Sequence, residues 1–224
     1  MEIEVVRNAR ARSMRLSLDR TTGRARLVVP KRAALKGALA WAEGKREWLE
    51  AQRARLPRSV PLVPGTTVTV DDVPLTILWS EGRRRAVLRE GATLSLQGPV
   101  DTVPRRVEAW LKRTALDLLD ADTRHYAALA GVTVSRVAIG DARGRWGSCA
   151  ASGAIRYSWR LVLAPSWVRR ATAAHEVAHR VHMNHGPAFH TLVAELYGAD
   201  PTPARAWLRA HGAALHWVGR SSGT

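Results

Sequence analysis

The sequence of 224 residues predicts an α+β fold with two domains, a small β-rich N-terminal domain with one helix (residues 1–100) and a compact α+β domain (residues 101–224). Short apolar segments separated by turn residues dominate the first hundred residues. A long amphipathic stretch then runs from Val103 to Leu129, and Gln97-Gly98-Pro99 forms a plausible boundary before it. The composition, 46% hydrophobic and 24% charged, is that of a folded protein.

The N-terminal domain is predicted to begin with a β-hairpin. Met14–Leu18 and Ala25–Val29 are apolar segments that flank Thr21-Thr22-Gly23, a sequence typical of a turn. Strong helix formers then predict one helix from about Ala33 to Arg55. Its apolar residues recur at roughly helical spacing: Leu35, Leu39, Ala42, Trp48 and Leu49. Turn residues separate four further predicted strands: Thr66–Val70, Leu75–Trp79, Arg85–Leu88 and Thr93–Leu96.

The C-terminal domain is predicted to contain four helices and two strands. Pro104 suits the first turn of the helix over Val103–Leu129, and Gly131 ends that helix. Two strands are expected on either side of a turn-rich segment, over Val132–Ile139 and Ile155–Leu163. Three helices complete the domain: Trp167 to about Val181 with Ser166 as N-cap, Pro187–Tyr197, and about Thr202 to His211.

Composition excludes several classes of protein. A single cysteine, Cys149, rules out an intramolecular disulfide framework and a zinc site made of thiolates alone. The first residues lack a secretory hydrophobic segment, and no apolar run is long enough to span a membrane. We therefore expect a cytoplasmic enzyme or binding protein with no membrane partner.

Positive charge is concentrated in two parts of the chain. The net charge is +16, from 35 basic and 19 acidic side chains. Residues 1–60 carry 15 basic and 6 acidic side chains, and residues 131–190 carry eight arginines and two acids. This segregation is compatible with weak, sequence-independent nucleic-acid binding, to which a local cluster would contribute: Arg7, Arg10, Arg12 and Arg15. A solvated surface in an arginine-rich composition explains the same charges equally well.

The strongest functional signal is a group of histidines. Five of the eight histidines lie between residues 175 and 190, and His175-Glu176-Val177-Ala178-His179 forms an HExxH motif. Helical residues four apart differ by about 40° in azimuth, so His175 and His179 can share one metal ion. Glu176 is placed to act as general base by taking a proton from the attacking water.

Hydrolytic zinc usually has a third protein ligand and one open position. His185 is the favoured third ligand if the chain bends after His179, and the neighbouring Asn184 and Gly186 tolerate such a bend. His182 is an alternative, although a continued helix would place it about 60° from His179 in azimuth. Glu195 is a second alternative. Because imidazole dominates the ligand set, zinc (Zn²⁺) is the expected metal.

The sequence resembles the YgjP-like metal-dependent hydrolases, relatives of the SprT-type zincins. The resemblance is strong from about residue 103 to 216 and weak before residue 100. The residues that carry it are the HExxH motif and three segments: Arg143 to Cys149, Ser158 to Pro165, and Met183-Asn184-His185-Gly186-Pro187-x-Phe189. The resemblance implies a zincin-like metal-binding domain, peptidase-like activity, and His185 as third metal ligand. Two positions depart from the common family pattern, His190 in place of tryptophan and Gly186 in place of serine.

Arg143 and Arg145 precede a predicted strand that, in a zincin fold, would lie near the metal helix. Their guanidinium groups suit a carbonyl or phosphate oxygen, so both are candidate catalytic residues. A tight turn with solvated arginines is the alternative. Cys149 is more simply a small buried thiol than a metal ligand.

These observations predict a zinc-dependent hydrolase that acts on a peptide or protein substrate. A zinc-dependent nucleotide pyrophosphatase that hydrolyses a nucleoside triphosphate is the alternative enzyme, because flanking arginines also suit a phosphoanhydride. A nucleic-acid-associated protein with a structural or vestigial metal site is an alternative of another class.

Overall fold

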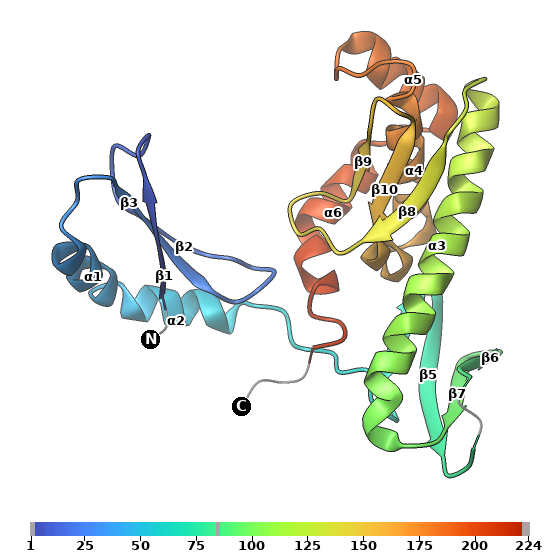
Figure 1. Cartoon of the computed structure of the whole chain (residues 1–224), viewed down its shortest axis with the longest axis horizontal. Coiled ribbons are helices and arrows are strands. Elements are labelled where there is room, and N and C mark those ends of the chain that lie inside the picture. The colour runs from blue at the N-terminus through green and yellow to red at the C-terminus, as the bar shows by residue number, and fades with distance from the viewer. Residues whose placement is uncertain (1–2, 84–85, 221–224) are drawn as a thin grey trace. The chain divides into compact units, whose positions relative to one another are not determined.

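The computed structural model describes residues 3–83 and 86–220, and it has the α+β architecture that the sequence predicts (Figure 1). The chain divides into two compact units, an N-terminal unit (Met1–Arg58) and a C-terminal unit (Ser59–Thr224). Three small mixed sheets and six α-helices make up the described part of the chain. No helix within that part is both long and apolar enough to cross a membrane.

The N-terminal unit is built on a three-stranded sheet in the order β1-β3-β2. Its strands are β1 (Ile3–Asn8), β2 (Arg15–Leu18) and β3 (Ala25–Pro30). β2 and β3 pair antiparallel, which confirms the predicted hairpin. β1 was not predicted. It pairs with β3 in parallel, and parallel strands are not joined by a short turn that the sequence could reveal.

The single helix predicted from Ala33 to Arg55 is wrong, because two helices occupy that segment. These are α1 (Leu35–Glu43) and α2 (Arg46–Ala54). The chain turns between them at Gly44, whose N–H bonds the carbonyl of Ala40. Glycine has a low helix propensity, so ending the helix at Gly44 costs little free energy.

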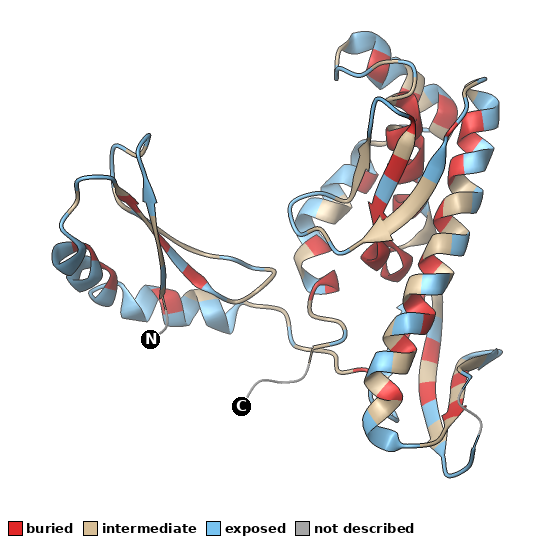
Figure 2. Ribbon diagram, in the orientation of Figure 1, coloured by how far each residue is buried: buried red, intermediate tan, exposed pale blue. Residues whose placement is uncertain are grey.

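The buried face of α1 is made of small residues. Ala38 and Ala42 are buried beside Leu27 and Val29 of β3, whereas the larger Leu39 is 41% exposed. Figure 2 shows the pale blue, solvent-facing side of this helix. Small side chains therefore bring α1 close to the sheet, and the large apolar residues are left on its outer side.

The C-terminal unit begins with a four-stranded sheet in the order β4-β5-β7-β6. Its strands are β4 (Thr67–Val70), β5 (Val73–Ser80), β6 (Leu88–Glu90) and β7 (Thr93–Gln97). The strand predicted over Arg85–Leu88 begins at Arg85, which lies outside the described residues. β5 and β7 pair in parallel, and the other two pairings are antiparallel.

This sheet shares a core with the segment that follows it. Val70, Ile77 and Leu96 are buried in the same cluster as Val107 and Leu111 of the long helix α3 (Val103–Leu129). The sequence placed a domain boundary near residue 100, whereas the structure places the division between its two compact units at residue 58. The physical reason is that the sheet has a buried face that α3 covers, which Gln97-Gly98-Pro99 cannot reveal.

The rest of the unit is a third sheet surrounded by helices. The predicted helix over Val103–Leu129 is confirmed as α3, and β8 and β9 flank β10 in the sheet. β9 was not predicted, and the second half of the strand predicted over Ile155–Leu163 is a 3-10 helix. The remaining elements are η1 (Val100–Thr102), β8 (Arg136–Gly140), β9 (Gly147–Cys149), β10 (Ala154–Ser158), η2 (Trp159–Leu163), α4 (Ser166–Ala178), α5 (Pro187–Tyr197) and α6 (Thr202–Leu215).

Tertiary contacts fix the start of α4. Ser166 is the first residue of this helix rather than its N-cap, and its N–H bonds Oδ1 of Asp72 at 3.0 Å. Arg169, only 4% exposed, pairs with Asp71 at 2.8 Å and with Asp122 of α3 at 3.1 Å. The β4–β5 turn and α3 thus hold the helix that carries the HExxH motif.

Candidate metal centre

Helix α4 is buried on most of its surface. Alanines and valines make up most of its buried residues, and the helix packs against α3, α5, α6 and β9. His175 lies near its C-terminal end, and His179 occupies the C-cap position with a near-helical backbone. The four-residue spacing therefore places both imidazoles on one side of α4, as the sequence predicts.

The chain leaves the helix immediately after His179. The N–H groups of Arg180 and His182 bond the carbonyls of Val177 and Ala178, which closes the last turn. The segment that follows brings His185 back over α4, where its Nε2 lies 3.3 Å from Nε2 of His175. The predicted bend is thus present.

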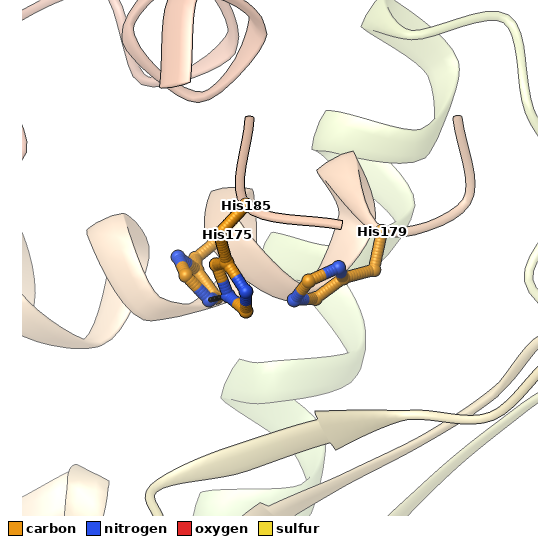
Figure 3. A group of neighbouring side chains, drawn as sticks. All are labelled: His175, His179 and His185. Atoms are coloured by element: carbon orange, nitrogen blue, oxygen red, sulfur yellow. Dashed lines mark hydrogen bonds between the residues drawn. The ribbon is translucent and has the colours of Figure 1, made fainter. Parts of the chain in front are cut away.

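Three imidazoles converge at this point (Figure 3). One ring nitrogen of each of His175, His179 and His185 lies within 4.8 Å of the others, so the group could hold a metal ion. It is the only such group found among the described residues, and neither alternative ligand belongs to it. His182 contributes a backbone carbonyl instead, and Glu195 is exposed on α5.

Two neighbours orient these imidazoles. Nδ1 of His179 lies 3.1 Å from the carbonyl oxygen of His182. Because a carbonyl only accepts, Nδ1 carries the proton and Nε2 is left with a lone pair for a metal. Phe189, fully buried on α5, contacts all three rings at centroid distances of 4.5 to 4.9 Å. Its role was not predicted, because nothing local in the sequence indicates this contact.

Burial keeps the imidazoles of His175 and His179 neutral. Burial first, and then the nearby His179 and His185, together lower the pKa of His175 to about 4. Burial is also the main cause of the lowered pKa of His179. Neutral imidazole is the form that binds a metal, so both rings can act as ligands at neutral pH without first losing a proton.

Glu176 is 5% exposed and faces β9. Burial raises the pKa of its carboxyl group to about 7, and the positive charge of Arg145 opposes this rise. Gly147 of β9 leaves the space that the carboxylate occupies, since a Cβ at position 147 would lie 2.6 Å from Cδ of Glu176. A cation on the three imidazoles would lower this pKa again by Coulombic attraction.

A pocket of about 250 Å³ opens beside His175 and Glu176. Its lining is mostly apolar, with side chains from α4, α5 and α6 and from the segment before β9. Its cationic or titratable residues, apart from His175 and Glu176, are Arg145, His190 and Arg205. A substrate group next to the histidines would therefore meet both an apolar wall and positive charge.

The structure separates the two predicted arginines. Arg145 lines the pocket with Glu176, whereas Arg143 is not among the described residues that line it. Arg143 instead lies near the buried His216, whose pKa is lowered by burial and then by Arg160 and Arg143. Arg205 of α6, which sequence reasoning missed, lines the pocket instead. No local signal could have found it.

The structure also shows the positions of Cys149 and His190, two other side chains singled out in the sequence. Cys149 lies outside the histidine group, and its thiol donates to the carbonyl of Ala150 at 3.6 Å. Burial raises the pKa of that thiol. His190 lines the pocket, and its ring centroid is 6.3 Å from that of His185. His190 is therefore an exposed polar group at the site.

Comparison with known proteins gives one match. Residues 12–211 match the family model described as "YgjP-like, metallopeptidase domain". Searches of curated proteins and of solved structures found no match.

Proposed function

The chain belongs to the YgjP-like metallopeptidase family, and on this premise we propose that it is a zinc-dependent hydrolase that cleaves peptide bonds. The observation that carries the proposal is the convergence of three imidazole nitrogens within 4.8 Å beside a pocket that the buried Glu176 also lines. Three nitrogen ligands suit zinc, and a three-ligand site leaves one position open for catalysis. A purely structural zinc normally has four protein ligands, which argues against the alternative of a structural metal site.

Each residue has a defined role in this proposal. When bound, zinc supplies a Lewis acid that lowers the pKa of a coordinated water to about 7. Glu176 accepts a proton from the attacking water, and its buried position keeps it basic enough to do so. Arg145, on the pocket wall, binds the oxygen on which negative charge develops. Phe189 and the carbonyl of His182 hold the imidazoles in place.

Phosphoanhydride hydrolysis is the second candidate activity. It is favoured by the presence of two arginines, Arg145 and Arg205, on the wall of the same pocket. Guanidinium groups pair well with phosphate oxygens, and the apolar wall could receive a nucleobase. Both candidate reactions use the same histidines and Glu176, so only the substrate distinguishes them.

A parallel screen tests the proposal. Unstructured casein peptides and nucleoside triphosphates are each incubated with the zinc-loaded protein and with its Glu176→Gln variant. We expect peptide cleavage that disappears in the variant. Triphosphate hydrolysis that depends on Glu176, without peptide cleavage, would overturn the peptidase proposal in favour of the pyrophosphatase. Activity that survives in the variant would come from another site or from a contaminant.

Variants of Arg143 and Arg145 also distinguish peptide cleavage from triphosphate hydrolysis. Loss of Arg143 and Arg145 together should lower triphosphate hydrolysis by at least the ~10²–10³ that loss of one donor to developing negative charge usually costs. Peptide cleavage should be weakened less, because a triphosphate carries several negative charges that guanidinium groups neutralise, whereas a peptide carbonyl develops only one. Of the single variants, Arg145→Ala should have the larger effect, because Arg143 is not among the described residues that line the pocket. Steady-state kcat and KM of both variants on both substrates measure this. Equal losses of activity in Arg143→Ala and Arg145→Ala would contradict the role given to Arg145 on the pocket wall.

Gly147→Ala should reduce hydrolysis by about a hundredfold, because its methyl group would displace the Glu176 carboxylate and misplaced catalytic groups cost rates of this size. Zinc affinity should be unchanged, since no histidine ligand moves. Gly144→Ala is the matched control, with no atom within 4 Å of the added Cβ. Neither glycine has a positive φ, so alanine strains neither backbone. Full activity in Gly147→Ala would show that this space is not required.

A further inference from the structure

Residues of β2 and α2 in the N-terminal unit line a groove of about 510 Å³. Trp48, Gln52 and Arg55 follow one another at spacings of four and three residues, so they share one side of α2. Arg15 and Arg20 line the groove from the β2 side. An aromatic ring and three guanidinium groups therefore meet in one depression, far in sequence from the metal ligands.

The described residues that line the groove carry positive charge. No carboxylate is among the described residues that line it. Within the described chain, no Asp or Glu lies at ion-pair distance from Arg15 or Arg55. The whole N-terminal unit carries 15 basic and 6 acidic side chains. An anionic ligand would thus meet complementary charge in the groove and a favourable field around it.

The exposed indole of Trp48 favours an anionic ligand that also has a ring able to stack on it. Its neighbour Leu49 is fully buried, whereas Trp48 is 43% exposed and lines the groove. An exposed indole beside arginines is the combination that proteins use to stack unpaired bases while they neutralise the backbone. Duplex bases are already stacked on one another and are not available to such a ring.

We propose that this groove binds single-stranded nucleic acid, with a base on Trp48 and phosphates paired with Arg15 and Arg55. The interaction is independent of the reaction proposed above, because it uses no residue of the metal centre. Two phosphate contacts, at about −0.7 each for a single strand, give a slope of about −1.4 for log affinity against log salt concentration.

Fluorescence anisotropy of a labelled oligothymidylate, titrated with the full chain at several salt concentrations, measures both affinity and slope. Trp48→Ala should weaken binding by about tenfold or more, as loss of one base–aromatic stack does. Trp48→Phe, which keeps a stacking ring, should retain most of the affinity. Trp41→Ala is the matched control, because Trp41 is also exposed, at 36%, but lies on α1 and does not line the groove.

A second matched pair tests the arginines. Arg55→Ala should weaken binding and reduce the salt slope by about 0.7. Arg53→Ala removes the same charge from the same helix but from a residue outside the groove lining, so it should leave the slope unchanged. Circular dichroism of each variant verifies that the unit remains folded.

Four outcomes would overturn the proposal. These are unchanged binding in a folded Trp48→Ala variant, equal losses in Arg53→Ala and Arg55→Ala, tighter binding of duplex than of single strand, and equal competition by polyglutamate, which has charge but no bases. Glu176→Gln should bind the oligonucleotide as the unaltered protein does. Failure of the groove and failure of the hydrolase are therefore distinguishable.

Discussion

Glu176→Gln should lower kcat/KM for hydrolysis by about 10³, within the range that a positioned general base contributes, while zinc stays bound. Glutamine has the size of glutamate and fits the space beside Gly147, so the packing of α4 against β9 is retained. Its amide cannot accept the proton of the attacking water. The three histidines are untouched, and no ligand is lost. Steady-state kinetics and zinc content on the same preparation measure both effects.

The control is another glutamate changed in the same way. Glu90 is exposed at the end of β6, and Glu90→Gln should change neither activity nor zinc content. A Glu176→Gln variant that remains active with zinc bound would show that another group is the base. A variant that loses zinc as well would place Glu176 among the metal ligands, against the arrangement described above.

His179→Ala should abolish zinc binding under conditions in which the unaltered protein binds one equivalent, and activity should be lost with the metal. Loss of a partner that only orients a ligand already costs 10–100-fold in affinity, so loss of a ligand should cost more. The remaining His175 and His185 cannot complete a three-ligand site. Competition with a chromogenic chelator measures the affinity, and circular dichroism shows whether the fold is retained.

His182→Ala separates the proposed ligand set from its nearest alternative. His182 supports the site through its backbone carbonyl, which alanine keeps, and its imidazole is outside the group of three. Zinc affinity in His182→Ala should therefore remain close to that of the unaltered protein. A loss as large as that in His179→Ala would mean that His182 is a ligand and that the bend after His179 differs in the metal-bound protein.

The sequence predicted best where structure depends on local spacing. Val103–Leu129 and Pro187–Tyr197 have helical periodicity and clear ends, and both match the observed helices. The prediction for residues 33–55 failed because helix propensity is high on both sides of Gly44, and propensity does not identify which face meets the sheet. β1 and β9 were not predicted because each is defined by its partner strand.

The sequence by itself determined how the two HExxH histidines of this protein are placed. A helix fixes the azimuth of residues four apart, so the HExxH spacing places His175 and His179 together before any tertiary contact forms. Asn184 and Gly186 permit the turn that returns His185, although that part depends on the packing of α5 through Phe189. These features are local, and local geometry is what a single sequence encodes most directly.

Only the tertiary structure decided the surroundings of Glu176. Three features arise where β9 packs against α4: the burial of Glu176, the space left by Gly147, and the position of Arg145 rather than Arg143 on the pocket wall. Arg205 reaches the same pocket from α6. The pKa of a carboxyl group depends on desolvation and on charges brought from distant segments, and both are set by the packing of the whole unit. The sequence could therefore identify Glu176 as the proposed base but not the environment that raises its pKa.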